Sequence, residues 1–143
     1  NILHIKSETA MIGYLNAPNP FTEDGWFNTG DSVDMDGEYI RIIGRSSEII
    51  NVGGEKVYPS EVESIIQEIR NVAEASVYGE RNLITGEIVC TKVRLITDED
   101  PKEFIRRLKK YCRDHLETYK IPVKVDITND ELYNNRYKKI KTI

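Results

Sequence analysis

The sequence of 143 residues lacks any long hydrophobic run and contains only two cysteines and one tryptophan. No apolar stretch approaches the roughly 18 residues that a membrane-spanning helix requires, so we expect no membrane span. Cys90 and Cys112 lack the close spacing of metal ligands, and we expect them to be buried, reduced thiols without a metal. The net charge of -4 disfavours sequence-independent nucleic-acid binding, which relies on cations that neutralise phosphates.

The composition that remains is that of an ordinary globular domain. Hydrophobic residues make up 39% of the chain and charged residues 31%. The length corresponds to about one domain. No secretory or transit signal is visible at Asn1, and together these features predict a cytoplasmic protein.

Strand and helix patterns alternate unevenly along the chain. Runs typical of strands occupy residues 38–43, 49–52, 72–78, 87–96 and 123–127, with a turn at 34–37 and a loop at 81–86. One helix is expected to open at residues 57–61, where a proline stands in the first turn, and a second helix after Asp100 has an apolar stripe and a basic face. The strands are too few for a doubly wound sheet, so we predict an α+β fold with a mixed sheet and flanking helices.

The segment Gly44–Glu63 is the richest in signals. It joins a strand exit at Arg45, the glycine pair Gly53-Gly54 and a helix start. Two adjacent glycines let the backbone turn or approach another surface where a Cβ would collide. We therefore expect chemistry in this segment.

Two blocks of sequence carry a resemblance to a known family. GWFNTGD (Gly25–Asp31) followed by GRSSEIINVGGEKVYPSEVE (Gly44–Glu63) resembles the adenylate-forming ligases, which include acyl-CoA synthetases, peptide-synthetase adenylation domains and luciferases. The glycine-rich block and TYKIP (Thr118–Pro122) are most similar to the acyl-CoA synthetases. The resemblance runs through essentially the whole chain.

This resemblance implies a division of the chain into parts. Residues 1–45 would end a large N-terminal adenylation domain, residues 46–48 would form a hinge, and residues 49–143 would form a small C-terminal lid. Ser47 falls at the pivot position, where the family usually has Asp or Lys, and serine tolerates a change of φ/ψ there. The family's loop for ATP phosphates, rich in Ser, Thr and Gly and ending in lysine, is missing, so we expect these 143 residues to be an inactive fragment of a longer ligase.

The resemblance also implies roles for individual residues. Asp31 would accept hydrogen bonds from the ribose hydroxyls of ATP or AMP, and Arg45 would contact ribose or phosphate. Lys56 would approach the AMP phosphate during thioester formation. The backbone of Gly53 and Gly54 would line the tunnel for the pantetheine of coenzyme A, although a tight bend explains both glycines equally well. Mg²⁺ would enter with ATP, and no metal site is expected in this chain.

The catalytic lysine of the family corresponds to Lys139 by its spacing from Leu132. The surrounding motif departs from the family pattern, because Tyr133, Asn135 and Lys138 replace a proline, a threonine and a glycine. Loss of the glycine alters a backbone position that only glycine adopts cheaply, so Lys138 stays open as an alternative. A fixed ammonium beside the transferring phosphate would stabilise developing charge.

Other functions stay open. A free-standing module that binds a carrier protein or partner enzyme is the alternative to a ligase lid, and a carrier-protein thiol is the alternative to coenzyme A. Nucleic-acid binding by the basic, tyrosine-containing tail is a third hypothesis, which rests on residues found only at one end of an acidic chain: Arg136, Lys138, Lys139, Lys141, Tyr133 and Tyr137. The sequence does not specify the acid substrate or an oligomeric state, and it gives His4 and His115 no role.

Overall fold

The computed structural model describes residues 1–134 and 138–140, and the chain forms two compact units, Asn1–Ser47 and Glu48–Ile143. The first unit contains a three-stranded antiparallel sheet in the order β1-β2-β3, with β1 at Ile2–Ile5, β2 at Phe27–Asp36 and β3 at Tyr39–Arg45. Asp36 pairs with Tyr39 across a tight turn in which Gly37 has φ of 61°, so the turn contains the positive φ that the sequence predicts there.

The division between the units falls inside the short 3₁₀ helix η1, Ser46–Glu48. This helix coincides with the segment predicted as a hinge. The hinge and the assignment of the two parts to a large domain and a lid are predictions.

The second unit contains a five-stranded mixed sheet. Strands β4 (Ile50–Val52) and β5 (Glu55–Val57) form a hairpin, and β4 adjoins β7 (Gly86–Leu95), which pairs along its length with antiparallel β6 (Val72–Asn82). Strand β8 (Lys124–Thr128) pairs with β7 in parallel. The central strand β7 is therefore covered on both edges.

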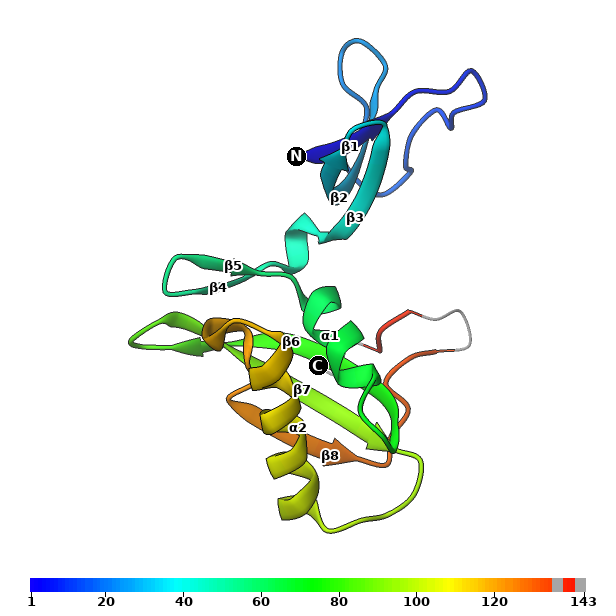
Figure 1. Cartoon of the computed structure of the whole chain (residues 1–143). Coiled ribbons are helices and arrows are strands. Elements are labelled where there is room, and N and C mark those ends of the chain that lie inside the picture. Colours follow the sequence, from blue (N-terminus) through cyan, green and yellow to red (C-terminus); the bar gives the residue numbers. More distant parts are fainter. Residues whose placement is uncertain (135–137, 141–143) are drawn as a thin grey trace. The chain divides into compact units, whose positions relative to one another are not determined.

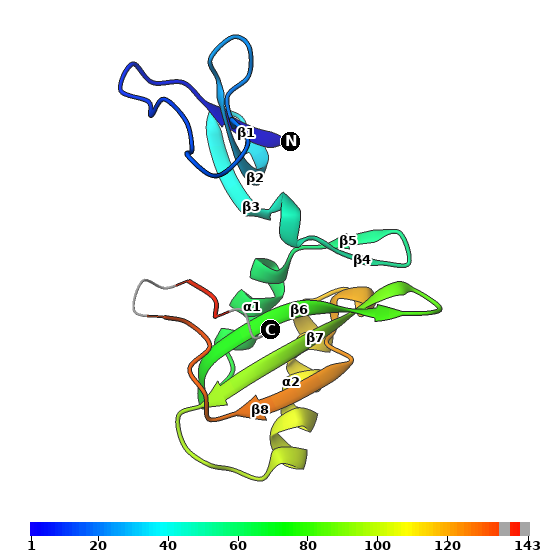
Figure 2. The same cartoon turned by 180° about the vertical axis from the view of Figure 1, so that it is seen from behind.

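Two helices, α1 (Pro59–Gln67) and α2 (Pro101–His115), cover one face of this sheet (Figures 1 and 2). A second 3₁₀ helix, η2, spans Thr118–Lys120. The core between sheet and helices is apolar and almost completely buried, with these members: Ile50, Val57, Val62, Ile66, Ile69, Ala75, Val77, Val89, Val93, Phe104, Leu108 and Cys112. This arrangement confirms the predicted α+β fold with a mixed sheet and flanking helices.

Two predicted boundaries are wrong. The helix expected from residue 57 begins at Pro59, because Glu55–Val57 pairs with β4 and leaves Tyr58 as the helix cap. The loop expected at residues 81–86 shrinks to 83–85, because β6 continues to Asn82 and pairs with Gly86. In both places, hydrogen bonding to a neighbouring strand makes the β-structure longer than the local sequence pattern predicts.

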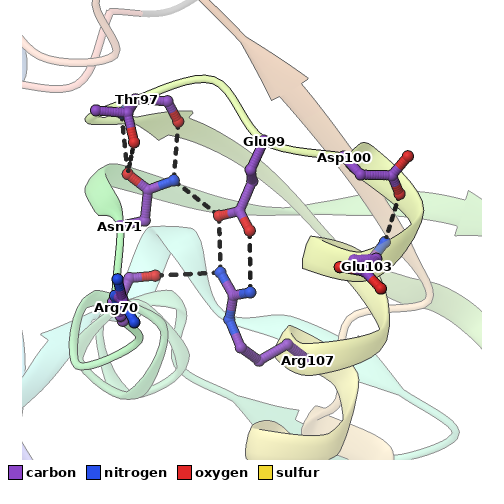
Figure 3. A network of polar contacts seen from close by, with 7 residues as sticks. All are labelled: Arg70, Asn71, Thr97, Glu99, Asp100, Glu103 and Arg107. Atoms are coloured by element: carbon purple, nitrogen blue, oxygen red, sulfur yellow. Dashed lines mark hydrogen bonds and ion pairs between the residues drawn. The ribbon is translucent and has the colours of Figure 1, made fainter.

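A network of polar side chains holds the end of α1 to the start of α2 (Figure 3). Asn71, at φ of 75°, donates to the Thr97 carbonyl and to Glu99 and accepts from the Thr97 amide and hydroxyl. Arg107 binds Glu99 through two hydrogen bonds of 2.7 and 2.9 Å and reaches the Arg70 carbonyl at 3.4 Å. Asp100 caps α2 by accepting from the Glu103 amide. These contacts join the segment after α1, the segment before α2 and helix α2 itself.

Both cysteines are buried and unpaired, as predicted. Burial raises the pKa of Cys112 to about 11 and also raises the pKa of Cys90, so both thiols stay protonated near neutral pH. None of the helices in the described part of the chain combines the length and the apolar character needed to cross a bilayer.

Candidate functional site

The first cluster of predicted site residues lies in the first unit, where strand pairing brings Asp31 and Arg45 together. The two residues are register partners on β2 and β3, and Arg45 Nε lies 2.9 Å from Asp31 Oδ1. Arg45 also donates to the Thr29 carbonyl at 2.9 Å. The guanidinium is thus oriented by two acceptors, while its side chain remains 57% exposed.

Hydrogen bonds of Thr29 and Gly30, within β2, fix the position of Asp31. The Thr29 hydroxyl accepts from the Asp31 amide at 3.1 Å and donates to the Leu3 carbonyl at 3.0 Å. Gly30 has φ of 75°, a conformation that favours glycine, and its carbonyl accepts from the Ser46 hydroxyl at 2.8 Å. The sequence Thr29-Gly30-Asp31 therefore presents a carboxylate beside a fixed guanidinium.

The second cluster is the turn of the β4–β5 hairpin. Gly53 and Gly54 form a two-residue loop between the paired residues Val52 and Glu55, with φ of 63° and 97°. Positive φ at both central positions is the signature of a type I′ turn. No atom lies within 4 Å of an ideal Cβ at either glycine, so backbone conformation, and not crowding, is what demands glycine here.

Hydrogen bonds tie this turn to the rest of the second unit. The Gly53 amide donates to the Thr85 carbonyl at 2.7 Å, and the Gly54 amide donates to Asn51 Oδ1 at 2.9 Å. The tight bend at the glycine pair is thus a feature of the fold, whereas the tunnel role remains a prediction. Lys56 lies on β5 opposite Asn51 and is exposed.

The third cluster surrounds Lys139. Its Nζ lies 2.6 Å from Glu63 Oε1 and 3.8 Å from Glu48 Oε2. The Glu63 side chain is only 10% exposed, and its Oε1 also accepts from the Val77 amide at 2.7 Å. The neighbouring Lys138 is exposed, so the two lysines that the sequence left as alternatives have different environments.

The tail that carries Lys139 is anchored beside β6 (Figure 2). The Leu132 amide donates to Glu74 Oε2 at 2.8 Å, and the Tyr133 hydroxyl donates to the Ala75 carbonyl at 2.9 Å. Tyr133 and Lys139 form an antiparallel bridge, with Ile140 donating to the Leu132 carbonyl at 2.9 Å. Burial, reinforced by nearby carboxylates, raises the pKa of Tyr133, so its phenol remains a donor.

Other residues of the predicted basic tail and motif fall outside the described residues. They are Asn135, Arg136, Tyr137 and Lys141. The predicted hinge residue Ser47 is exposed at the end of the first unit. The described part of the chain contains no group of three or more His, Cys, Asp or Glu arranged to hold a metal ion.

Glu63 is a functional candidate that the sequence analysis did not single out. The buried face of α1 consists of Pro59, Val62, Glu63 and Ile66, which follow the helical spacing i, i+3, i+4, i+7. A carboxylate within that stripe has to be buried and therefore needs a partner. This position in the pattern was the available signal.

Comparison with known proteins identifies the family. The model of the AMP-binding enzyme C-terminal domain matches residues 61–139, a range that begins in α1 and ends at Lys139. The chain belongs to this family. It contains the C-terminal domain of the AMP-binding enzymes, in the acyl-CoA ligase superfamily, as the sequence resemblance predicted.

The similarity extends over both units of the chain. A long-chain-fatty-acid–CoA ligase of Haemophilus influenzae is 35% identical over 96% of this chain, and a 2-succinylbenzoate–CoA ligase of Geobacillus kaustophilus is 35% identical over 95%. The chain spans 25% and 28% of these two relatives.

A solved structure shows the same fold. The o-succinylbenzoate CoA synthetase of Bacillus subtilis, in complex with its acyl-adenylate intermediate, has a TM-score of 0.82 and 31% identity. The match covers 95% of this chain and 28% of that one. The fold of the AMP-binding C-terminal domain is therefore present here, together with the segment that precedes it.

Proposed function

We propose that this chain supplies the lid and the adjoining nucleotide-binding strands of a ligase that activates a carboxylic acid with ATP and transfers it to coenzyme A. The observation that carries this proposal is the 31% identity, across both units, to a CoA synthetase that holds an acyl-adenylate. Relatives named as CoA ligases favour coenzyme A over a carrier-protein thiol as acceptor. The acid itself is not specified by these residues.

In the first half-reaction a carboxylate oxygen bonds to the α-phosphorus of ATP and pyrophosphate leaves. Asp31 accepts hydrogen bonds from the ribose hydroxyls, and Arg45, already oriented by Asp31 and the Thr29 carbonyl, binds ribose or phosphate. Lys139 places its ammonium beside the α-phosphate and stabilises the charge that develops on the phosphate oxygens. Mg²⁺ arrives bound to the phosphates of ATP.

In the second half-reaction the thiol bonds to the acyl carbon and AMP leaves. The lid turns about Ser47, which withdraws Lys139 and brings the β4–β5 turn to the nucleotide. Gly53 and Gly54 line the passage for pantetheine, where the open space around both glycines leaves room, and Lys56 approaches the AMP phosphate. Because its side chain is exposed on β5, Lys56 is accessible for this contact.

The catalytic lysine is tested in the complete ligase that carries these residues, by comparing Lys139→Ala with the matched control Lys138→Ala. We expect Lys139→Ala to lower acid-dependent pyrophosphate exchange by about 100-fold or more, as for loss of a charge-stabilising group, while thioester formation from supplied acyl-adenylate persists. Lys138→Ala should retain exchange. Unchanged exchange in Lys139→Ala would refute the assignment.

The tunnel role of the glycine turn is tested by Gly54→Leu and Gly54→Asn in the same ligase. Asparagine tolerates positive φ better than leucine and is shorter, so it separates a blocked passage from a strained turn. We expect Gly54→Leu to abolish thioester formation and spare pyrophosphate exchange. An equal loss of both half-reactions in Gly54→Leu would contradict the tunnel role.

The expected dependence on the missing phosphate loop is tested with the 143-residue chain alone. Because these residues provide no loop for the ATP phosphates, we expect the purified chain to give no pyrophosphate exchange. Exchange above the level of a Lys139→Ala control would show that the chain is active by itself.

A further inference from the structure

Lys139 and Glu63 form a close ion pair in a partly dehydrated position. The Nζ to Oε1 distance is 2.6 Å, and the two side chains are 27% and 10% exposed. Glu63 is held from the other side by the Val77 amide, which donates to the same Oε1 at 2.7 Å. The carboxylate is thus held between α1 and the backbone of β6, whereas the ammonium ends a side chain of four methylene groups whose bonds can rotate.

The anchoring of the tail supports this distinction between a fixed and a movable partner. The segment before Lys139 is attached to β6 at Leu132 and Tyr133. Lys139 itself is joined to the tail by the bridge to Tyr133 and by hydrogen bonds of its neighbours. Its long side chain can leave Glu63 while the anchored segment stays in place.

Charge explains why this contact matters for the proposed reaction. An ammonium that binds Glu63 is not available to phosphate oxygens, and its departure leaves a buried carboxylate with neutral hydrogen-bond partners, the Val77 amide and the Tyr133 side chain, and without its close cation. Glu48 lies 3.8 Å from the same ammonium, but its side chain is 47% exposed and therefore screened by water. Glu63 is the carboxylate that competes effectively for the lysine.

We propose that Glu63 is a positioning residue that holds the catalytic lysine on the lid when it is not at the nucleotide. The proposal rests on the proposed function of Lys139 as the adenylation lysine. Release of Lys139 from Glu63 precedes each adenylation, and recapture follows when the lid turns for thioester formation. Glu63 thereby determines how readily Lys139 becomes available for adenylation.

The first test is chemical labelling of Lys139 in the complete ligase without ATP, with an amine-reactive acylating reagent and peptide mass spectrometry. Lys138 in the same molecule is the internal reference. Glu63→Gln keeps an oxygen for the Val77 amide and removes the charge, and we expect it to raise the Lys139 labelling rate on the order of tenfold. Glu48→Gln is the matched control and should change the rate less than about twofold.

The second test separates the half-reactions. Removal of the competing carboxylate should lower the KM for ATP in pyrophosphate exchange several-fold, while thioester formation from supplied acyl-adenylate keeps its rate. An unchanged Lys139 labelling rate in Glu63→Gln, or a raised KM for ATP, would overturn the proposal. Labelling does not depend on activity, so it distinguishes failure of this inference from failure of the catalytic assignment of Lys139.

A reciprocal variant keeps the proposal testable if Glu63→Gln does not fold. Lys139→Gln leaves Glu63 without its cation, whereas Lys138→Gln removes an exposed charge at the preceding residue. We expect Lys139→Gln to lower the melting temperature measurably and Lys138→Gln to leave it unchanged. Equal melting temperatures would show that the Lys139 and Glu63 contact is not maintained in solution.

Discussion

Two ion pairs in this protein have similar lengths and different origins. Asp31 and Arg45 lie 2.9 Å apart because β2 and β3 place them opposite each other, only 14 positions apart in the chain. Glu63 and Lys139 lie 2.6 Å apart although they are 76 positions apart, on α1 and on the tail. The local pair leaves its arginine 57% exposed, while the distant pair has a carboxylate that is 10% exposed.

The difference shows how exposure decides the consequence of the same contact. The Asp31 and Arg45 pair is screened by water and orients a guanidinium without stabilising the fold strongly. The Glu63 and Lys139 pair links the tail to the core. Loss of one partner there leaves the other charge unpaired in a position that water reaches poorly. Under the proposed function, Arg45 has to remain accessible to the nucleotide, whereas Lys139 can be partly covered by Glu63 between reactions.

The sharpest test of this contrast compares Glu63→Ala with Asp31→Ala in urea denaturation of the chain. Glu63→Ala removes the partner of Lys139 and the acceptor of the Val77 amide, and we expect it to cost about 3 kcal/mol of unfolding free energy. Asp31→Ala should cost about 1 kcal/mol or less. Equal losses would show that exposure does not separate the two pairs.

A second contact between distant segments is the Asn71 network. Asn71→Ala removes hydrogen bonds to Thr97 and Glu99 and places alanine, which tolerates positive φ less well than asparagine, at a φ of 75°, so we expect a loss of about 2–3 kcal/mol. Asn71→Gly loses the same hydrogen bonds without that strain and should cost about 1 kcal/mol less. Thermal and urea unfolding measure both variants, and no difference between them would contradict a role for the backbone conformation.

The glycine turn is the local counterpart of the Asn71 network. Its hydrogen bonds use backbone amides, which any residue supplies, and only its φ values favour glycine. We expect Gly54→Ala to cost about 1–2 kcal/mol and Gly54→Asn distinctly less, because asparagine tolerates the left-handed region. Urea denaturation gives both values, and equal costs would indicate that something other than φ selects glycine here.

The smallest expected effect concerns acid pH. The hydrogen bonds from Arg107 lower the pKa of Glu99 below its ordinary value of 4.5. A carboxyl group whose pKa is lower in the folded state stabilises the fold above pH 4.5, and this contribution is lost as pH falls through the folded pKa. Glu99→Gln should therefore be less stable than wild type at neutral pH and equally stable in strong acid.

Glu103→Gln is the matched control for this pH dependence. Its carboxylate lies 3.9 Å from Arg106, and both side chains are more than 70% exposed, with 73% for Glu103 and 81% for Arg106. Denaturation curves for Glu103→Gln should follow wild type across the same pH range. A constant difference between Glu99→Gln and wild type at every pH would contradict the electrostatic origin of the effect.

Local signals predicted the parts of the site that depend on neighbouring residues. The turn at Gly37, the strand that leads to Arg45 and the stripe on α2 all follow from short-range patterns, and the structure contains each of them. The β4–β5 hairpin was not predicted, because the sequence pattern placed Val57 at the start of a helix. In the structure Val57 pairs with Ile50 of β4 and belongs to a strand. The burial of Glu63 was missed for a related reason, since its partner lies far along the chain.

By itself, the sequence determined the family, the α+β class and the bend at the glycine pair, because propensities and turn chemistry act over a few residues. The pairing of β2 with β3 decided that Asp31 lies beside Arg45. The tertiary structure decided which of two adjacent lysines faces α1 and which acid receives it. That choice depends on how the tail packs beside β6, through contacts between Leu132 and Glu74 and between Tyr133 and Ala75. Glu63 and Lys139 are brought together by the packing of segments that are far apart in the chain. No local sequence pattern predicts a contact between such distant residues.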